Sequence, residues 1–148
     1  MRHLQFSIVC LLAGYLTLAR GQDTKPNLSG NWQLNSAKSE RRSGRAAAIG
    51  LAIEQKGSSI HVIKTAKATD GKEMKTGFRC TTDGKDCLVG GTKISLWYDG
   101  AVLVELDVGS EVVSKSSMKL GTDGKSMSVD VVYIVPQGDG DKLVLEKI

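Results

Sequence analysis

The chain has 148 residues, 41% of them hydrophobic and 24% charged, and its formal net charge is +4. This length suits a single domain. A charge so close to neutral does not provide the strongly basic surface that nucleic-acid binding requires. Beyond the first 21 residues, no apolar run approaches the length of a membrane-spanning helix, so we expect neither a nucleic acid nor a membrane span.

The first 21 residues have the layout of a secretory signal peptide. Arg2 and His3 give the segment a positively charged start, and an apolar run follows over residues 4–18. Residues 19–21, Ala-Arg-Gly, then place small side chains at the positions that a signal peptidase reads. We therefore expect residues 1–21 to be cleaved and the protein to be secreted or periplasmic.

Cleavage would leave a mature chain of 127 residues that begins at Gln22. The leader removes two arginines and no acidic residue, so the net charge falls from +4 to +2. We expect residues 22–28 to be a flexible lead-in and residues 29–148 to form one domain, and we expect this domain to be a monomer.

Repeated Asp-Gly pairs divide the mature chain into short segments rich in Val, Ile, Leu and Thr, which is typical of consecutive β-hairpins. The pairs lie at residues 70–71, 83–84, 99–100, 123–124 and 139–140. We expect strands at residues 30–35, 47–56, 59–68, 73–80, 87–90, 93–98, 101–108, 111–120, 126–135 and 142–147, with a loop at 138–141. The pattern predicts an all-β antiparallel meander that closes into one 8–10-stranded barrel, because an open sheet would leave its apolar face in water.

The hairpin at Asp123-Gly124 predicts a specific register. A turn centred there places the following residues opposite each other and on one face: Leu120 and Met127, Met118 and Val129, Ser116 and Val131, Ser114 and Tyr133, Val112 and Val135. That face is mainly apolar, whereas the opposite face is mixed, so we expect the first to point into the barrel.

Even-numbered aliphatic residues over 102–108 alternate with Leu103, Glu105 and Asp107. We expect the aliphatic set to face the core and the two acids to mark a solvated face rather than a catalytic pair. His61 lies between Ile60 and Val62 on an expected strand, where a histidine is usually exposed or satisfied. Because no nucleophile–base arrangement, phosphate loop or metal motif accompanies these residues, we expect no enzymatic activity, no cofactor and no metal.

Two cysteines remain after Cys10 leaves with the leader. If Asp83-Gly84 is a two-residue hairpin loop, Cys80 lies directly opposite Cys87, at a separation that a disulfide tolerates. An exported protein also meets an oxidising compartment. We expect a Cys80–Cys87 disulfide; the alternatives are two free buried thiols or half of a metal site.

The start of the expected domain resembles a known barrel group. Residues 28–35, Leu-Ser-Gly-Asn-Trp-Gln-Leu-Asn, contain the Gly-x-Trp of the first strand of lipocalins and fatty-acid-binding proteins, the calycins. With residues 97–104 and 120–129, the chain is similar to small secreted bacterial proteins described as lipocalin-like. The resemblance implies a ligand-binding barrel in which Trp32 closes the floor.

The resemblance also gives a meaning to the charged run at residues 38–45. In calycin barrels the segment after the first strand lies over the mouth, so Arg41, Arg42 and Arg45 could receive an anionic headgroup there. The alternative is a solvated linker that aids solubility.

Polar residues on the expected inner face favour a cavity. A filled core has little use for Ser114 and Ser116, whereas a cavity wall that also includes Tyr133 can use their hydroxyls. We expect a non-catalytic binding protein for a small hydrophobic molecule or anionic amphiphile. The alternative is a solid-core structural or interaction module of the cell envelope, its core filled by Trp32, Phe78, Trp97, Tyr98 and Tyr133.

Overall fold

The computed structural model describes residues 24–43, 48–68 and 70–148. These residues form eleven strands and one 3-10 turn. In chain order the elements are β1 (Gly30–Leu34), η1 (Ser36–Lys38), β2 (Glu40–Arg41), β3 (Ala48–Lys56), β4 (Ser59–Lys67), β5 (Glu73–Thr81), β6 (Asp83–Val89), β7 (Thr92–Asp99), β8 (Val102–Val108), β9 (Val113–Leu120), β10 (Ser126–Val135) and β11 (Gly138–Lys147). None of the described segments is a helix suited to crossing a bilayer.

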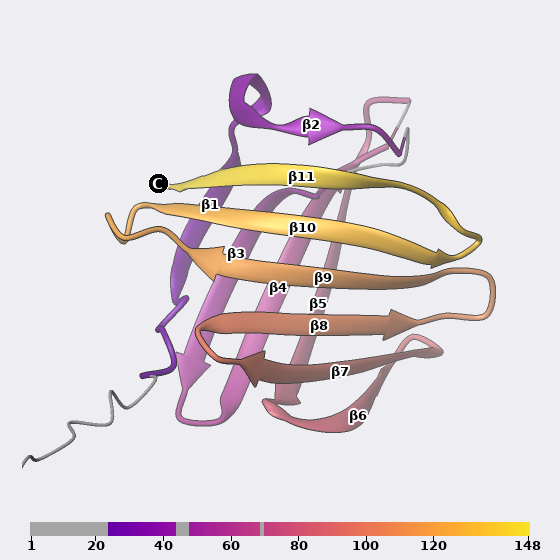
Figure 1. Cartoon of the computed structure of the whole chain (residues 1–148). Coiled ribbons are helices and arrows are strands. Elements are labelled where there is room, and N and C mark those ends of the chain that lie inside the picture. The colour runs from indigo at the N-terminus through magenta and orange to yellow at the C-terminus, as the bar shows by residue number, and fades with distance from the viewer. Residues whose placement is uncertain (1–23, 44–47, 69) are drawn as a thin grey trace, which may run out of the picture.

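The strands form one antiparallel sheet in the order β5-β4-β3-β1-β11-β10-β9-β8-β7-β6, and the short β2 also pairs with β11. Figure 1 shows β7 to β11 as a front layer that crosses β1, β3, β4 and β5 behind it. The sheet therefore curls until its two ends approach each other. This nearly closed antiparallel barrel confirms the fold class predicted from the sequence.

A disulfide joins the two ends of the sheet. Cys80 on β5 is bonded to Cys87 on β6, with their Cα atoms 5.8 Å apart. The predicted bond is confirmed, but the predicted hairpin is wrong, because β5 pairs with β4 and β6 pairs with β7. Asp83 and Gly84 do not fold the chain back: Asp83 already lies opposite Trp97 of β7, so this segment carries the chain across the gap.

The β9–β10 hairpin has the predicted register over most of its length. Leu120 lies opposite Met127, and the next three predicted pairs also match. Beyond Tyr133 a bulge shifts the register, so that Val135 lies opposite Val113 instead of Val112. Gly140 lies so close to the Val131 carbonyl oxygen that a Cβ atom there would clash. Residues 138–141, which we expected to form a loop, are instead the first residues of β11 and pair with the bulged strand β10.

Apolar side chains fill one end of the barrel, which we call the floor. Its fully buried residues are Leu28, Trp32, Ile60, Leu96, Leu103, Met127 and Leu145. Trp32 is 2% exposed, and its indole Nε1 donates a hydrogen bond to the Leu28 carbonyl at 2.9 Å, as expected of a residue that closes the floor. Leu28, which we expected in a free lead-in, is itself completely buried.

The inward face of β8 is the reverse of the predicted one. Leu103 and Glu105 are 0% and 1% exposed and point inward, whereas Val108 is 37% exposed on the outside. The acids therefore do not mark a solvated face. The even-numbered aliphatic residues of β8 point outward instead, where Val104 is buried and lies opposite Trp97 of β7.

Candidate ligand-binding cavity

A cavity of about 410 Å³ lies inside the barrel above the floor. Its apolar walls include Leu51, Val62, Phe78, Met118, Val129 and Leu143, from six different strands. Its polar residues include Thr76, Thr92, Ser114, Ser116 and Tyr133, together with four charged residues discussed below. A volume of this size falls within the range of small-molecule sites. The barrel is therefore not filled by its own side chains, and the solid-core alternative does not describe it.

Lys64 enters the cavity because of the alternation along β4. Ile60 and Val62 point inward, and two residues further on the same face carries Lys64 and then Ala66. The sequence analysis did not single out Lys64. The signal was available, since a lysine continues an apolar alternation at a position where the next inward side chain is expected.

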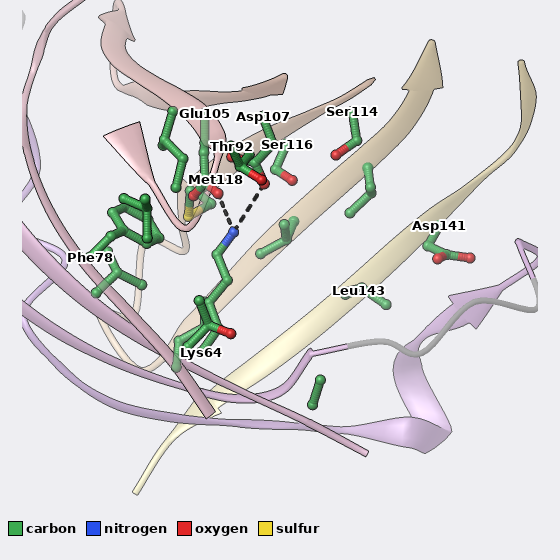
Figure 2. A pocket seen from close by; sticks show the side chains of 18 of the residues that line it. Lys64, Phe78, Thr92, Glu105, Asp107, Ser114, Ser116, Met118, Asp141 and Leu143 are labelled. Carbon is green, nitrogen blue, oxygen red and sulfur yellow. Dashed lines mark hydrogen bonds and ion pairs between the residues drawn. The ribbon is translucent and has the colours of Figure 1, made fainter. Parts of the chain in front are cut away.

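The Lys64 side chain extends across the cavity, and its ammonium group reaches the opposite wall. It forms a close ion pair with Glu105 Oε1 and lies 3.4 Å from Asp107 Oδ2, both on β8 (Figure 2). It also lies 5.4 Å from the centre of the Phe78 ring. These three charged residues, here called the triad, link two strands that are far apart in the sheet order.

Burial changes the protonation of the triad. Removal from water raises the pKa of Glu105 to about 7; the Lys64 charge opposes this rise and the Asp107 charge adds to it. Burial alone would lower the pKa of Lys64, but Glu105 and Asp107 outweigh it and hold that pKa above its usual value. Lys64 thus stays cationic, while Glu105 changes charge near neutral pH.

Two carboxylate oxygens of the triad lack protein partners. Glu105 Oε2 and Asp107 Oδ1 are buried, and neither accepts a hydrogen bond from a residue that the structure describes. Leaving a buried acceptor unpaired costs free energy comparable to a lost hydrogen bond, and more for a charged group. The triad can therefore accept hydrogen bonds from a molecule in the cavity.

Asp141 marks the rim of the cavity, where β2 pairs with β11. It accepts hydrogen bonds from the backbone N–H groups of Arg42 and Ser43, at 2.8 and 2.9 Å, and from the Ser43 hydroxyl at 2.6 Å. Burial alone would raise its pKa, but these hydrogen bonds and the Arg41 charge outweigh it and lower that pKa. Asp141 is thus an ionised carboxylate that the β2 segment satisfies.

The predicted rim arginines occupy different surroundings. Arg41 lies opposite Asp141 in the strand pairing, on the cavity side, whereas the exposed Arg42 side chain forms an ion pair with Glu40. Arg45 lies outside the described residues. The cavity lining includes neither Arg41 nor Arg42, so the described residues do not show the expected arginine site at the mouth, and that site stays a prediction.

The other predicted residues are placed more simply. Ser114, Ser116 and Tyr133 line the cavity, as the β9–β10 register predicted. His61 points away from the cavity, and its Nδ1 lies 3.9 Å from Glu54 on the outer face. The described part of the chain contains no cluster of three or more side chains suited to holding a metal ion.

The comparisons with known proteins show a likeness in fold. No protein-family model matches the sequence, and no curated protein does. Among solved structures, the wild-type fluorescent protein UnaG aligns with a TM-score of 0.59 and 14% identity, over 82% of this chain and 97% of that one. A point mutant of UnaG aligns with a TM-score of 0.53 and 15% identity, over 82% and 96%. The architecture is therefore that of a calycin-type β-barrel.

Proposed function

We propose that the protein is a non-catalytic binding protein that holds one small amphipathic molecule inside the barrel. The observation that carries this proposal is a cavity of about 410 Å³ with mainly apolar walls and unpartnered buried carboxylate oxygens. Apolar burial would provide most of the affinity, and the few polar groups would orient the guest.

The arrangement of ionisable groups favours binding over catalysis. In the triad, Lys64 is engaged with Glu105 and Asp107 rather than placed to activate a hydroxyl nucleophile. His61, the one histidine among the described residues, lies on the outer face of β4 and not in the cavity. A binding role requires only the shape and polarity that the cavity already has.

A fluorescence titration tests the proposed function. Nile red, a neutral dye that brightens in apolar surroundings, should bind with saturation at one molecule per chain. Ser116→Phe places a ring in the cavity wall and should abolish binding. Ser128→Phe adds the same ring on the exposed outer face of β10 and should leave binding unchanged. Absence of binding to the wild type, or equal binding by both variants, would refute the proposal.

We also propose that the protein acts outside the cytoplasm, on the grounds of the charged and apolar leader and the disulfide. Expression with the leader should give exported protein that begins at Gln22, or directly after Ala19. Its intact mass should be two protons below that of the reduced chain. A mass that still includes Met1, or thiols that alkylate without a reductant, would contradict this proposal.

A further inference from the structure

We infer that the guest of the cavity is a cationic amphiphile, an alkylammonium whose N–H groups donate hydrogen bonds to Glu105 and Asp107. This inference rests on the proposed function and specifies the chemistry of the same site. It differs from the anionic guest that the sequence predicted, because the charges inside the barrel are opposite in sign to those expected at its mouth.

The charge inside the cavity favours a cation. Over residues 24–43, 48–68 and 70–148, its lining includes one cation, Lys64, and three carboxylates, Glu105, Asp107 and Asp141. Asp141 is already satisfied by donors from the β2 segment and lies near the Arg41 charge. When both of its acids are ionised, the triad carries a net charge of −1, which one ammonium neutralises.

The hydrogen-bonding pattern favours a cation with N–H donors in particular. Lys64 uses Glu105 Oε1 and Asp107 Oδ2, and the other oxygen of each carboxylate is buried without a partner. A primary ammonium has three donors and no acceptor, so it can supply both oxygens at once. A quaternary ammonium of the same charge has no donor and can supply neither.

An anionic headgroup at this depth would meet an unfavourable field. Among the residues that the structure describes, Lys64 is the one cation of the lining, and it already lies between two carboxylates, so an anion approaching it would also approach Glu105 and Asp107. Arg42 is directed to Glu40 on the outside and gives no compensation within the cavity. The surrounding walls, which include Phe78, Met118 and Leu143, suit an alkyl chain of either guest.

Four ligands with one ten-carbon chain test the inference by isothermal titration calorimetry: decylamine, decanol, decanoate and decyltrimethylammonium. They are used below the concentrations at which they form micelles and at about pH 8, where Glu105 is ionised. Decylamine should bind about tenfold more tightly than each of the other three, the effect of one charge-assisted hydrogen bond. Decanoate or decanol binding as tightly as decylamine would overturn the inference, and so would equal binding of the quaternary ammonium.

Isosteric variants test whether Glu105 and Asp107 cause the preference for decylamine. Glu105→Gln and Asp107→Asn should each lower decylamine affinity about tenfold and change decanol affinity less, because a neutral hydroxyl gains less from the carboxylate charge than an ammonium does. Glu111→Gln and Asp130→Asn, at exposed positions, make the same chemical changes outside the cavity and should have no effect. A preference for decylamine that survives both cavity variants would overturn the inference. Failure of Nile red and of all four ligands to bind would instead refute the proposed function itself.

Discussion

The two halves of the barrel interior differ in packing and polarity, although both are lined by strands with the same alternation of side chains. At the floor, inward residues such as Trp32, Leu96 and Leu103 are completely or almost completely buried. In the cavity half, the same strands carry Lys64 and Glu105 at inward positions, around a space of about 410 Å³. The change occurs within one strand: on β8, Leu103 belongs to the floor, and Glu105, two residues on, belongs to the triad.

The comparison separates residues that stabilise the fold from residues that are retained for another reason. Burying an ion pair usually gives little net stability over apolar residues of similar size. A chain selected only for stability would therefore extend the apolar floor upward. The proposed ligand would account for the presence of Lys64, Glu105 and Asp107, and the two halves should then respond differently to mutation.

The largest effect should follow from opening the floor. Trp32→Ala should lower the free energy of unfolding by about 3–5 kcal/mol, because it removes a buried ring and leaves a cavity. Trp97→Ala is the matched control, since Trp97 lies on the outer face of β7 and is only partly buried, and its loss should be clearly smaller. Denaturant titration measures both, and equal losses would contradict the distinction between floor and surface.

Removal of the disulfide by mutation should have the next largest effect on stability. Cys80→Ala combined with Cys87→Ala should lower the free energy of unfolding by about 2.5 kcal/mol, the loop-closure value for a loop of about eight residues. Because the bond joins the two ends of the sheet, amide exchange should accelerate most in β5 and β6. Faster exchange spread evenly over the barrel would show that the bond does not hold the gap.

Within the cavity half, removal of the Lys64 charge should destabilise the protein, and removal of all three charges of the triad should not. Lys64→Met leaves two carboxylates uncompensated and should cost about 2 kcal/mol, less than a fully buried pair because 27% of the Lys64 side chain is exposed. The triple variant Lys64→Met, Glu105→Gln, Asp107→Asn should recover most of that loss. Thermal or denaturant unfolding checks the pair, and a triple variant no more stable than the single one would mean that the triad stabilises the fold.

The smallest effect concerns pH. Glu105 has a pKa of about 7 in the folded protein, above the value of about 4.3 expected when unfolded. The folded state therefore binds the proton more tightly, so stability falls as pH rises from about 5 to 8. Relative to Glu105→Gln, the wild type should lose on the order of 2 kcal/mol across this window. The carboxylates with a lowered pKa, such as Asp141 and Asp123, change stability at pH values below this window. Parallel stability curves for the two proteins would contradict the buried position of Glu105.

A feature of this fold could be predicted from the sequence where a local pattern of residues determined it. The register of the β9–β10 hairpin follows from the Asp123-Gly124 turn and a one-sided apolar pattern, and both are visible in the sequence. This register correctly placed Ser114, Ser116 and Tyr133 in the wall. Asp83-Gly84 has the same dipeptide but crosses between the ends of the sheet, and that role depends on how the whole barrel curls.

The two acids of the triad could not be predicted because they break the rule that the prediction used. Acids on a strand usually face water, so Glu105 and Asp107 were assigned to the outside and the valines of β8 to the core. Both faces of the strand carry buried apolar residues, Leu103 on the inner side and Val104 on the outer side, so its pattern alone did not fix the direction. Functional sites are where such local rules are expected to fail.

A titration of the isotope-labelled protein with decylamine, followed by nuclear magnetic resonance, tests the central claim most directly. Resonances near the cavity, around Lys64, Glu105, Asp107 and Ser116, should shift and saturate together. Resonances on the outer face, around His61, should stay unchanged. Shifts confined to the outer face, or no saturable shift of the triad at all, would contradict the claim that the ionised half of this barrel is a ligand site.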